Sequence, residues 1–202
     1  KAADTTITTA NIPETVTYQG ITYNVTSIGW FAFENCRSLT SVTIPNSVII
    51  IGDGAFANCS SLTSVTIPNS IVSIGKGAFY DCTGLTSMDI PNSVTTIDTG
   101  AFYGCAGLTS INIPNSITSI KTSTFYGCSG LTSIDIPNSV TSIGGYAFAN
   151  CTGLTEVTIP ESVTSINSAA FLGNTNLTTL HFNAIHCDFN LEQYLVFPNT
   201  IN

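Results

Sequence analysis

Cysteine is the residue type of this sequence best suited to metal binding or redox chemistry, and six of the seven cysteines recur at every twenty-third position. They occupy positions 36, 59, 82, 105, 128 and 151, and the seventh is Cys187. A zinc site needs ligands that converge on one point, whereas residues repeated at a fixed step lie in a line. Neighbouring copies about 5 Å apart fall within the range of disulfide Cα atoms, but parallel side chains are poorly placed to bridge. We therefore predict small, buried, unreactive cysteines, with Cys187 the one thiol expected to be exposed or paired.

The two histidines, His181 and His186, lie near Cys187 and are the remaining candidates for metal binding or general-base catalysis. Their spacing matches no standard pair of zinc ligands, and the sequence offers no evident fourth ligand. The motifs G-x-S-x-G, G-x-x-x-x-G-K and H-E-x-x-H do not occur in the sequence. We therefore predict no metal site and no cofactor, and we expect both histidines at the surface.

Paired carboxylates could still support acid–base catalysis, and Asp89 and Asp135 are separated by twice the step of the cysteines. If one step corresponds to one layer of a stacked structure, the two carboxylates lie ~10 Å apart. This distance is near the upper limit for the acid and the base of an inverting glycosidase. A flat, open surface cannot exclude water or raise a carboxyl pKa by burial. We therefore predict that the protein is not an enzyme.

The 23-residue step of the cysteines extends to other residue types and reveals an internal repeat. The unit is I-G-x-x-A-F-x-x-C-x-x-L-T-S-V-T-I-P-N-S-V-T-S, and its seven copies begin at Ile28, Ile51, Ile74, Ile97, Ile120, Ile143 and Ile166. Prolines recur from position 45 to 160 and phenylalanines from 33 to 171 in the same register. Each unit is too small to bury its own apolar side chains, so the copies must stack and turn each position into a continuous column.

Within one unit, the alternation of residues indicates a short strand. Apolar Val65 and Ile67 alternate with polar Ser64 and Thr66, which is typical of a half-buried strand. Pro68 lacks an N–H group and ends the row of hydrogen-bond donors. Downstream, Ile71 and Ile74 supply a second inward pair and Phe79 a bulky filler, and no segment has the ten or more residues of helical periodicity that a helix needs.

These residues carry a family resemblance. The unit resembles the BspA-like (treponemal-type) leucine-rich repeat, whose pattern L-x-x-L-x-L-P-x-x-L-x-x-I-x-x-x-A-F-x-x-C is met almost residue for residue from Leu39 to Cys151. The repeats cover about four-fifths of the chain. The resemblance implies a secreted or cell-surface bacterial or protist protein, often an adhesin, and it brings no catalytic residues. We predict a right-handed, weakly curved leucine-rich-repeat solenoid, mostly β with short turns or 3-10 segments.

The chain divides into three parts of one solenoid domain. Residues 1–27 contain two alternating runs around Gln19-Gly20 that predict an N-terminal β-hairpin cap. Residues 28–188 hold the seven 23-residue repeats. Residues 189–202 form a partial repeat or a C-terminal cap, in which Phe197–Ile201 echoes the I-P-N-S-V segment. We interpret this last echo as the boundary of a fragment, with an unusual cap as the alternative.

Two polar columns on the predicted strands form the surface most suited to binding. One column comprises Thr43, Thr66, Asp89, Asn112, Asp135, Thr158 and His181, and in the other a run of serines ends at Glu156 and Thr179. Most of these side chains are short, which gives a flat face rich in hydroxyl and amide groups. We predict that the first column, together with Glu156, forms a binding face; a solvated polar face and a weak calcium site at Asp89, Asn112 and Asp135 are the alternatives.

A stripe of three tyrosines follows the repeated phenylalanine in consecutive copies. Tyr80, Tyr103 and Tyr126 each stand one residue after that phenylalanine. Pointing outward, they would form an aromatic patch of the kind enriched at interfaces. Packed against the neighbouring corner, they would shield the column of phenylalanines. The sequence leaves both arrangements open.

Composition limits the class of partner. The chain has 12 acidic and 4 basic residues and a net charge of −8, and only 8% of its residues are charged. Scattered cations cannot neutralise a row of phosphates, so we expect neither nucleic acid nor an anionic membrane surface as a partner. No apolar run approaches the roughly 20 residues of a transmembrane helix, and no signal peptide is visible, which is expected of a cytosolic chain or of one whose leader has been removed.

Two functions remain after these exclusions. The first is an extracellular or cell-surface module that binds a protein or a glycan through the strand face, because repeat architectures supply extended surfaces. The second is a passive spacer within a larger surface protein, which the similarity of the copies to one another favours.

Overall fold

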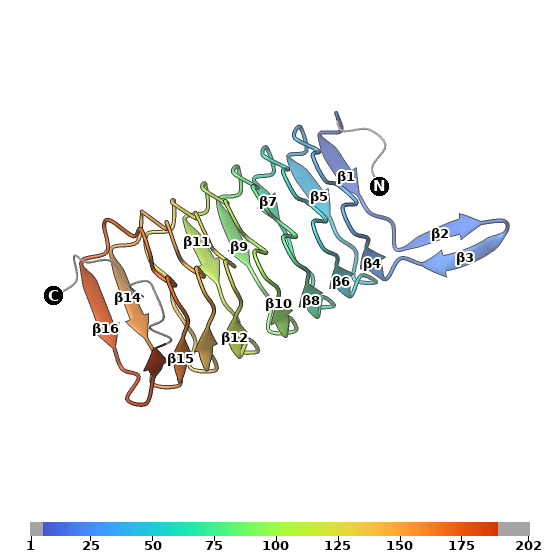
Figure 1. Cartoon of the computed structure of the whole chain (residues 1–202). Helices are drawn as coiled ribbons and strands as arrows, with labels where there is room; N and C mark the ends of the chain where they lie inside the picture. Colours follow the sequence, from blue (N-terminus) through green and yellow to red (C-terminus); the bar gives the residue numbers. More distant parts are fainter. Residues whose placement is uncertain (1–5, 190–202) are drawn as a thin grey trace.

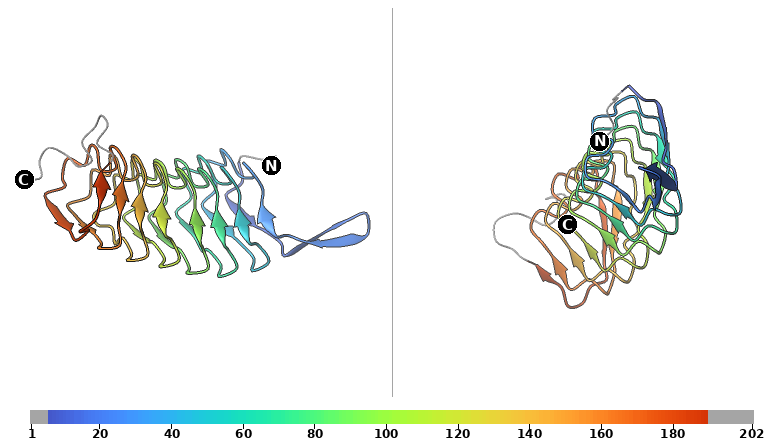
Figure 2. Two further views of the ribbon diagram at one scale, coloured as in Figure 1. Left: turned by 60° about the horizontal axis from the view of Figure 1, so that its bottom comes forward. Right: turned by 90° about the vertical axis from the view of Figure 1, so that its right-hand side faces the viewer.

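The computed structural model describes residues 6–189, and every helix or strand assigned within this range is a β-strand. The chain winds into coils that stand side by side along one axis, with the first and last coils at opposite ends (Figure 1). The axis curves little, and successive coils are rotated relative to one another (Figure 2). The predicted solenoid, mostly β with short turns, is confirmed. The predicted repeat-like segment at 190–202 lies outside the described residues.

Most coils contain two short strands, which lie on opposite sides of the solenoid. The first side, called the strand face here, comprises β1 (Thr9–Asn11), β5 (Ser41–Thr43), β7 (Ser64–Val65), β9 (Ser87–Asp89), β11 (Ser110–Asn112), β14 (Glu156–Ile159) and β16 (Thr179–Phe182). The second side, called the back, comprises β4 (Ser27–Ile28), β6 (Ile50–Ile51), β8 (Ser73–Ile74), β10 (Thr96–Ile97), β12 (Ser119–Ile120), β13 (Ser142–Ile143), β15 (Ser165–Ile166) and β17 (Asp188–Phe189). All pairings between coils are parallel, as expected when each strand is one full coil from the next.

The register of these pairings follows the 23-residue step of the sequence. Ser41 pairs with Ser64 on the strand face, and Ile143 pairs with Ile166 on the back. Within β5, Val42 is buried between two exposed residues, which is the alternation that the sequence predicts. Equivalent side chains therefore lie above one another in continuous columns.

The interior is organised around the repeated phenylalanines. Neighbouring rings from Phe33 to Phe171 stack with centroids 5.2 to 5.6 Å apart and planes within 13° of parallel. Phe56, Phe79 and Phe102 are fully buried. Aromatic rings at these separations attract one another beyond the effect of area burial. One line of rings thus runs through the solenoid, as the repeat predicts.

The six cysteines of the repeat form a second interior column, and each of them is fully buried. The Sγ atom of Cys59 donates a hydrogen bond to the Phe33 carbonyl of the preceding coil at 3.1 Å, and four following cysteines repeat this contact. Burial raises the pKa of Cys59 and of Cys151 to about 12. Within the described residues, the cysteines from Cys59 onward form no disulfide, and Cys187 is partly exposed. The predicted buried, unreactive thiols are present, and they also act as donors between coils.

The corner is the segment that joins each back strand to the following strand of the strand face, for example residues 52–61. Its backbone donates three hydrogen bonds to the next corner: Gly54 N to Lys76 O, Phe56 N to Ala78 O, and Asn58 N to Tyr80 O, at 2.8, 2.8 and 2.7 Å. The same three bonds recur at all six junctions between residues 31 and 172. The corners therefore form an unbroken ladder along the solenoid.

The strand face is less continuous than the corner. Its pairings fall into three groups, namely β1 with β5 and β7, β9 with β11, and β14 with β16. Residues 133–136 carry no assigned strand, although their sequence repeats the pattern of their neighbours. The sheet is thus interrupted on both sides of this segment.

The N-terminal end carries two further strands, β2 (Thr15–Tyr18) and β3 (Ile21–Asn24), which pair antiparallel around Gln19-Gly20. Every residue of these two strands is exposed, and the hairpin extends away from the coils (Figure 1). β1 pairs with β5 and continues the strand face beyond the first coil. The capping role of the hairpin stays a prediction.

Candidate binding site on the strand face

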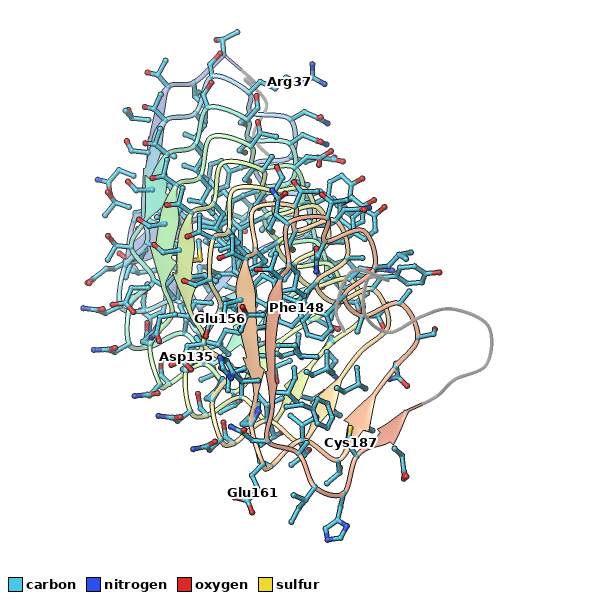
Figure 3. All side chains as sticks on the ribbon, turned by 90° about the vertical axis from the view of Figure 1, so that its left-hand side faces the viewer. Arg37, Asp135, Phe148, Glu156, Glu161 and Cys187 are labelled. Carbon is cyan, nitrogen blue, oxygen red and sulfur yellow. The ribbon has the colours of Figure 1, made fainter. Side chains whose placement is uncertain are left out.

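The polar column predicted from the sequence lies on the strand face. All of its predicted residues are exposed: Thr43, Thr66, Asp89, Asn112, Asp135, Glu156, Thr158 and His181. They are exposed because the apolar residues that alternate with them fill the interior, for example Met88 and Ile90 on either side of Asp89. Figure 3 shows Asp135 and Glu156 near the strand face and Phe148 inside the coils. The column is therefore available to a partner along the length of the solenoid.

Some members of the column contact one another. The Asn112 side chain donates to Asp89 Oδ1 at 3.2 Å, because the two residues are paired in adjacent strands. His181 Nε2 lies 2.9 Å from Glu156 Oε1, and both side chains are more than half exposed. Exposed pairs of this kind add little to stability. Their effect is to orient polar groups on the face.

A groove of about 490 Å³ lies where the columns reach the turn after the strands. Polar side chains dominate its lining: Asn112, Asn115, Asp135, Asn138, Thr158, Glu161 and Asn183, beside Pro137 and Pro160. Figure 3 places Glu161 at this turn. The groove includes Asp135 and Ile136, which belong to the segment without an assigned strand. The hollow thus coincides with the interruption of the sheet.

The groove unites only part of the predicted face. It brings together Asn112, Asp135 and Thr158, whereas Thr43, Thr66, Asp89, Glu156 and His181 lie outside its lining. It adds a column that the sequence analysis missed, made of the residue after each proline: Asn115, Asn138 and Glu161. A signal for this column was present, because an asparagine follows most repeated prolines and the last copy has Glu161 instead.

Comparison with known proteins gives the family. A family model described as the BspA type leucine rich repeat region, in six copies, matches residues 3–131 and 95–194. The chain belongs to the BspA-type leucine-rich repeat family. The resemblance noted from the repeat unit is therefore confirmed. A comparison with curated proteins gave no match.

Solved structures of bacterial leucine-rich repeat proteins are similar to this BspA-type chain. A protein from T. pallidum is 30% identical, with a TM-score of 0.56 over 87% of this chain and 69% of that one. A protein from Bacteroides ovatus is 24% identical, with a TM-score of 0.56 over 90% of this chain and 70% of that one. A leucine rich cell surface protein from Faecalibacterium prausnitzii is 24% identical, with a TM-score of 0.48 over 92% of both chains. The first two comparisons show the same solenoid fold.

The structure bears on the metal and thiol chemistry of this BspA-type solenoid. Within residues 6–189 no three His, Cys, Asp or Glu side chains are placed to hold a metal ion together. Burial raises the pKa of the column cysteines from Cys59 to Cys151, which disfavours the nucleophilic thiolate form. A leucine-rich-repeat solenoid typically serves as a non-catalytic scaffold. In the part of the chain that the structure describes, no helix has the length and apolar character needed to cross a bilayer.

The tyrosine stripe of this BspA-type chain combines the two arrangements that the sequence left open. The ring of Tyr103 stacks on those of Tyr80 and Tyr126, with centroids 4.8 and 4.6 Å apart. Tyr80 is exposed, and the other two are half-buried. Burial, followed by the neighbouring tyrosines, raises the pKa of Tyr103. The stripe both covers the corner and presents aromatic surface to solvent.

Proposed function

We propose that the chain is a recognition module of a secreted or cell-surface protein and that it binds a glycan through the strand-face groove. The observation that carries this proposal is the lining of the groove, where amide, carboxylate and hydroxyl groups from consecutive coils lie side by side. Asparagine side chains donate to and accept from neighbouring hydroxyl groups, and carboxylates accept from them; hydroxyl groups are what a sugar ring presents. Membership of the BspA-type family supports the surface location.

A glycan suits the groove better than a protein surface does. Protein interfaces are centred on aromatic and apolar side chains that are fully desolvated. The lining of the groove contains no aromatic residue, and its apolar members are Ile113, Ile136 and two prolines. A polar ligand with many hydroxyl groups could match this lining without leaving its amides unpaired.

Screening of the chain on a glycan array, followed by calorimetric titration of the best glycan, tests the proposal. We expect Asp135→Ala and Glu161→Gln each to weaken binding by roughly tenfold or more, since a hydrogen bond to a charged group contributes about 1.5–3 kcal/mol. Glu34→Gln makes the same chemical change as Glu161→Gln on another part of the surface and should leave the affinity unchanged. Equal binding by all three variants would contradict a glycan site in the groove.

A spacer function is the alternative, and a specific observation favours it. The corner ladder and the line of phenylalanine rings run without interruption through seven copies, as a stiff connector requires. If no glycan and no protein bound the chain, while its fold stayed intact by circular dichroism, the spacer would replace the recognition module as our explanation.

A further inference from the structure

Exposed apolar side chains gather at the N-terminal end of the solenoid, away from the strand-face groove. Among the described residues, fourteen large apolar side chains are exposed, and ten of them precede residue 81. Trp30 is the most exposed of all, at 77%, and Phe31 is 47% exposed. Isolated apolar residues are ordinary on a protein surface, but a contiguous group marks an interaction site.

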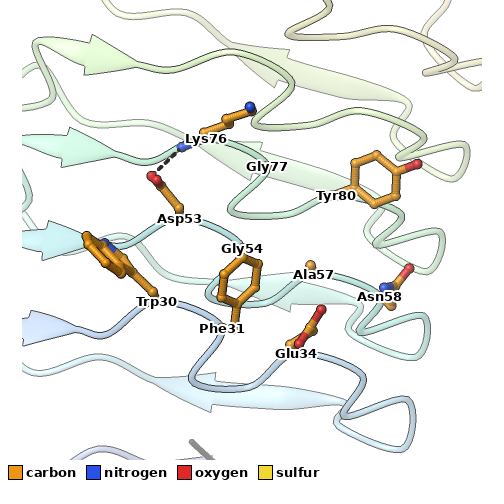
Figure 4. Close-up of a pocket in the computed structure, with 10 residues that line it drawn as sticks. All are labelled: Trp30, Phe31, Glu34, Asp53, Gly54, Ala57, Asn58, Lys76, Gly77 and Tyr80. Atoms are coloured by element: carbon orange, nitrogen blue, oxygen red, sulfur yellow. Dashed lines mark hydrogen bonds between the residues drawn. The ribbon is translucent and has the colours of Figure 1, made fainter.

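Trp30 and Phe31 form one wall of a pocket of about 520 Å³ on the corners of the first three coils (Figure 4). The opposite wall is Tyr80, and the small residues Gly54, Ala57 and Gly77 lie between. The ring of Phe31 lies so close to Gly54 that a β-carbon at this glycine would clash with the ring. The pocket therefore depends on residues without side-chain bulk in the second and third coils.

The pocket contains a gap in the tyrosine stack. The residue after the repeated phenylalanine is Glu34 in the first coil, Ala57 in the second and Tyr80 in the third. From Tyr80 onward, each coil of the stripe supplies one ring, and the rings stack at 4.8 and 4.6 Å. Ala57 supplies no ring, so the face of Tyr80 that points toward the N-terminus is not covered by a tyrosine. One coil step is thus open between Tyr80 and Glu34, which are two steps, roughly 10 Å, apart.

The backbone at this pocket is strained. Phe31 has a φ of 53°, in the left-handed region that every coil adopts at this position; the equivalent residue is glycine in three of the following coils and Ser123, Tyr146 or Ala169 in the others. A left-handed conformation is unfavourable for a residue with a side chain, and bulky residues adopt it rarely. Strain of this kind gathers at binding sites, where a side chain is held in a conformation that serves a ligand. Phe31 and Tyr146 are the two aromatic residues at this position, both are exposed, and Phe31 is the one that lines the pocket.

We propose that this gap, called the guanidinium slot here, binds an arginine side chain of a protein partner. A guanidinium is planar and stacks on aromatic faces, so it can take the place of the missing ring on Tyr80. Its charge would then lie beside the Glu34 carboxylate, one coil step further on. Glu34 and Asp53 against Lys76 give the pocket a net charge of −1. This sign matches a cation, as does the net charge of −8 of the chain.

The positions of the other charged groups fit this occupant. Asp53 Oδ1 accepts the backbone N–H of Lys76 at 2.9 Å, which holds the carboxylate on the Lys76 side of the pocket (Figure 4). Lys76 and Asp53 belong to the column of Trp30, whereas the slot lies in the column of Glu34, Ala57 and Tyr80. Glu34 is therefore the carboxylate available to a cation in the slot.

The surroundings of the slot favour a protein as the source of the arginine. Trp30, Phe31 and Tyr80, which line the pocket, are exposed aromatic side chains. Apolar and aromatic side chains around a charged anchor are typical of protein interfaces, in which arginine and tryptophan are enriched. This site is separate from the groove on the strand face, so it does not depend on the proposed glycan binding.

Trp30 provides the measurement, because it is the single tryptophan of the chain. The capped tripeptides Leu-Arg-Leu and Leu-Lys-Leu are titrated against the full chain while the fluorescence of Trp30 is recorded. We expect saturable binding of the arginine peptide and binding of the lysine peptide weaker by about fivefold or more, since the planar guanidinium stacks and the ammonium does not. Equal affinities for the two peptides would overturn the assignment to a guanidinium.

Two variants and a matched control complete the test. Ala57→Tyr places in the slot the residue that the next three coils carry, so the fold is retained and the affinity for the arginine peptide should fall by more than about tenfold. Glu34→Gln should weaken it by about fivefold, and Glu161→Gln, the same change in the strand-face groove, should have no effect. Retention of full affinity by Ala57→Tyr, with a native circular dichroism spectrum, would refute the proposal.

Discussion

The strand-face groove and the guanidinium slot are built in opposite ways on the same repeat. The groove lies where the sheet is interrupted, and its lining is polar. The slot lies on the corner ladder, which is unbroken, and its walls are aromatic. The polar lining follows from columns that the repeat maintains, whereas the slot exists because single coils depart from the repeat at Trp30, Phe31 and Ala57. A repeat protein can thus gain a site either by conserving the residue type of a column through several coils or by replacing it in one coil.

The difference in backbone pairing also predicts a difference in rigidity. Three hydrogen bonds join each corner to the next at every junction, and the cysteine and phenylalanine columns lie inside this ladder. The strand face has fewer pairings near residues 133–136. Segments with fewer protected backbone hydrogen bonds open more readily. We therefore expect the corner to be the more stable of the two regions, and four experiments test this expectation.

Raising the pH should have the largest effect, because it acts on the cysteine column of the corner. The pKa of Cys59 is about 12 in the folded chain, against 9.0 for an ordinary thiol. The folded chain holds this proton more tightly, so the stabilisation is complete below pH 9 and is lost as the pH rises toward 12. Each buried thiol with such a shift should lower the free energy of unfolding by about 1.4 kcal/mol per pH unit in this window.

Urea titrations between pH 8 and pH 11 measure this slope. Cys59→Ser, whose hydroxyl group can still donate to the Phe33 carbonyl, should reduce the dependence of the free energy of unfolding on pH by the contribution of one thiol. Cys187→Ser, outside the column, should change this dependence less. A slope that is the same in all three proteins would show that the corner does not depend on protonated thiols.

Truncation of the interior should destabilise the corner more than the strand face. Phe102→Ala removes a ring from the middle of the stack and should cost about 3–5 kcal/mol, whereas Ile111→Val beneath the strand face should cost about 0.5–1.5 kcal/mol. Both residues are buried in the same part of the solenoid. Chemical denaturation of both variants gives the comparison, and the size-matched pair Leu108→Ala in the corner and Ile111→Ala on the strand face, both at buried residues, separates position from side-chain size.

Restoring a regular column should stabilise the corner by a smaller amount. Asn174 takes the place of the cysteine in the last copy, and its Nδ2 donates to the Phe148 carbonyl at 3.0 Å. Its Oδ1 is buried and has no hydrogen-bond partner among the described residues. Since an unpaired buried acceptor costs about 1–3 kcal/mol, Asn174→Cys should raise the free energy of unfolding by roughly 1 kcal/mol. A loss of stability in thermal denaturation would mean that the asparagine is better accommodated than its geometry indicates.

Relief of backbone strain should have the smallest effect and should separate stability from binding. Ser123 has a φ of 54° at a position where other coils carry glycine. Ser123→Gly should stabilise the chain by up to about 1 kcal/mol and leave arginine-peptide binding unchanged. Phe31→Gly relieves the same strain in the wall of the pocket beside the slot and should weaken peptide binding. Thermal denaturation measures the effect on stability, and the Trp30 titration measures the effect on peptide binding. Unchanged peptide affinity of Phe31→Gly would show that Phe31 does not contribute to binding.

The sequence was sufficient to predict the architecture because the repeat constrains it at several positions at once. Phenylalanine, cysteine and proline share one step, and that step sets the pairing of Ser41 with Ser64 and the stacking of Phe56 on Phe79. The alternation around Val65 likewise identified which side chains face the interior. Features that depend on the residues of a single column were therefore predictable.

The sites were less predictable because they depend on relations between columns. The predicted face contains Asn112, Asp135 and Thr158, but the groove also needs the turn residues Asn138 and Glu161, whose proximity follows from the path of the turn. Likewise, the role proposed for Phe31 depends on its positive φ, and the role proposed for Ala57 depends on the tyrosine rings that stack in the following coils. The stripe of tyrosines was evident in the sequence, but the gap that precedes it was not.

The regular step between coils fixes the spacing of sites along the solenoid. The slot occupies the first three coils and the groove the fourth to the seventh, so the separation of a bound protein and a bound glycan along the solenoid axis would be set by the number of coil steps of about 5 Å between them. Duplication or deletion of one repeat unit between the two sites would lengthen or shorten this separation by one coil step. It would also rotate one ligand relative to the other. Geometry between two partners could thus evolve without any change in the residues that contact them.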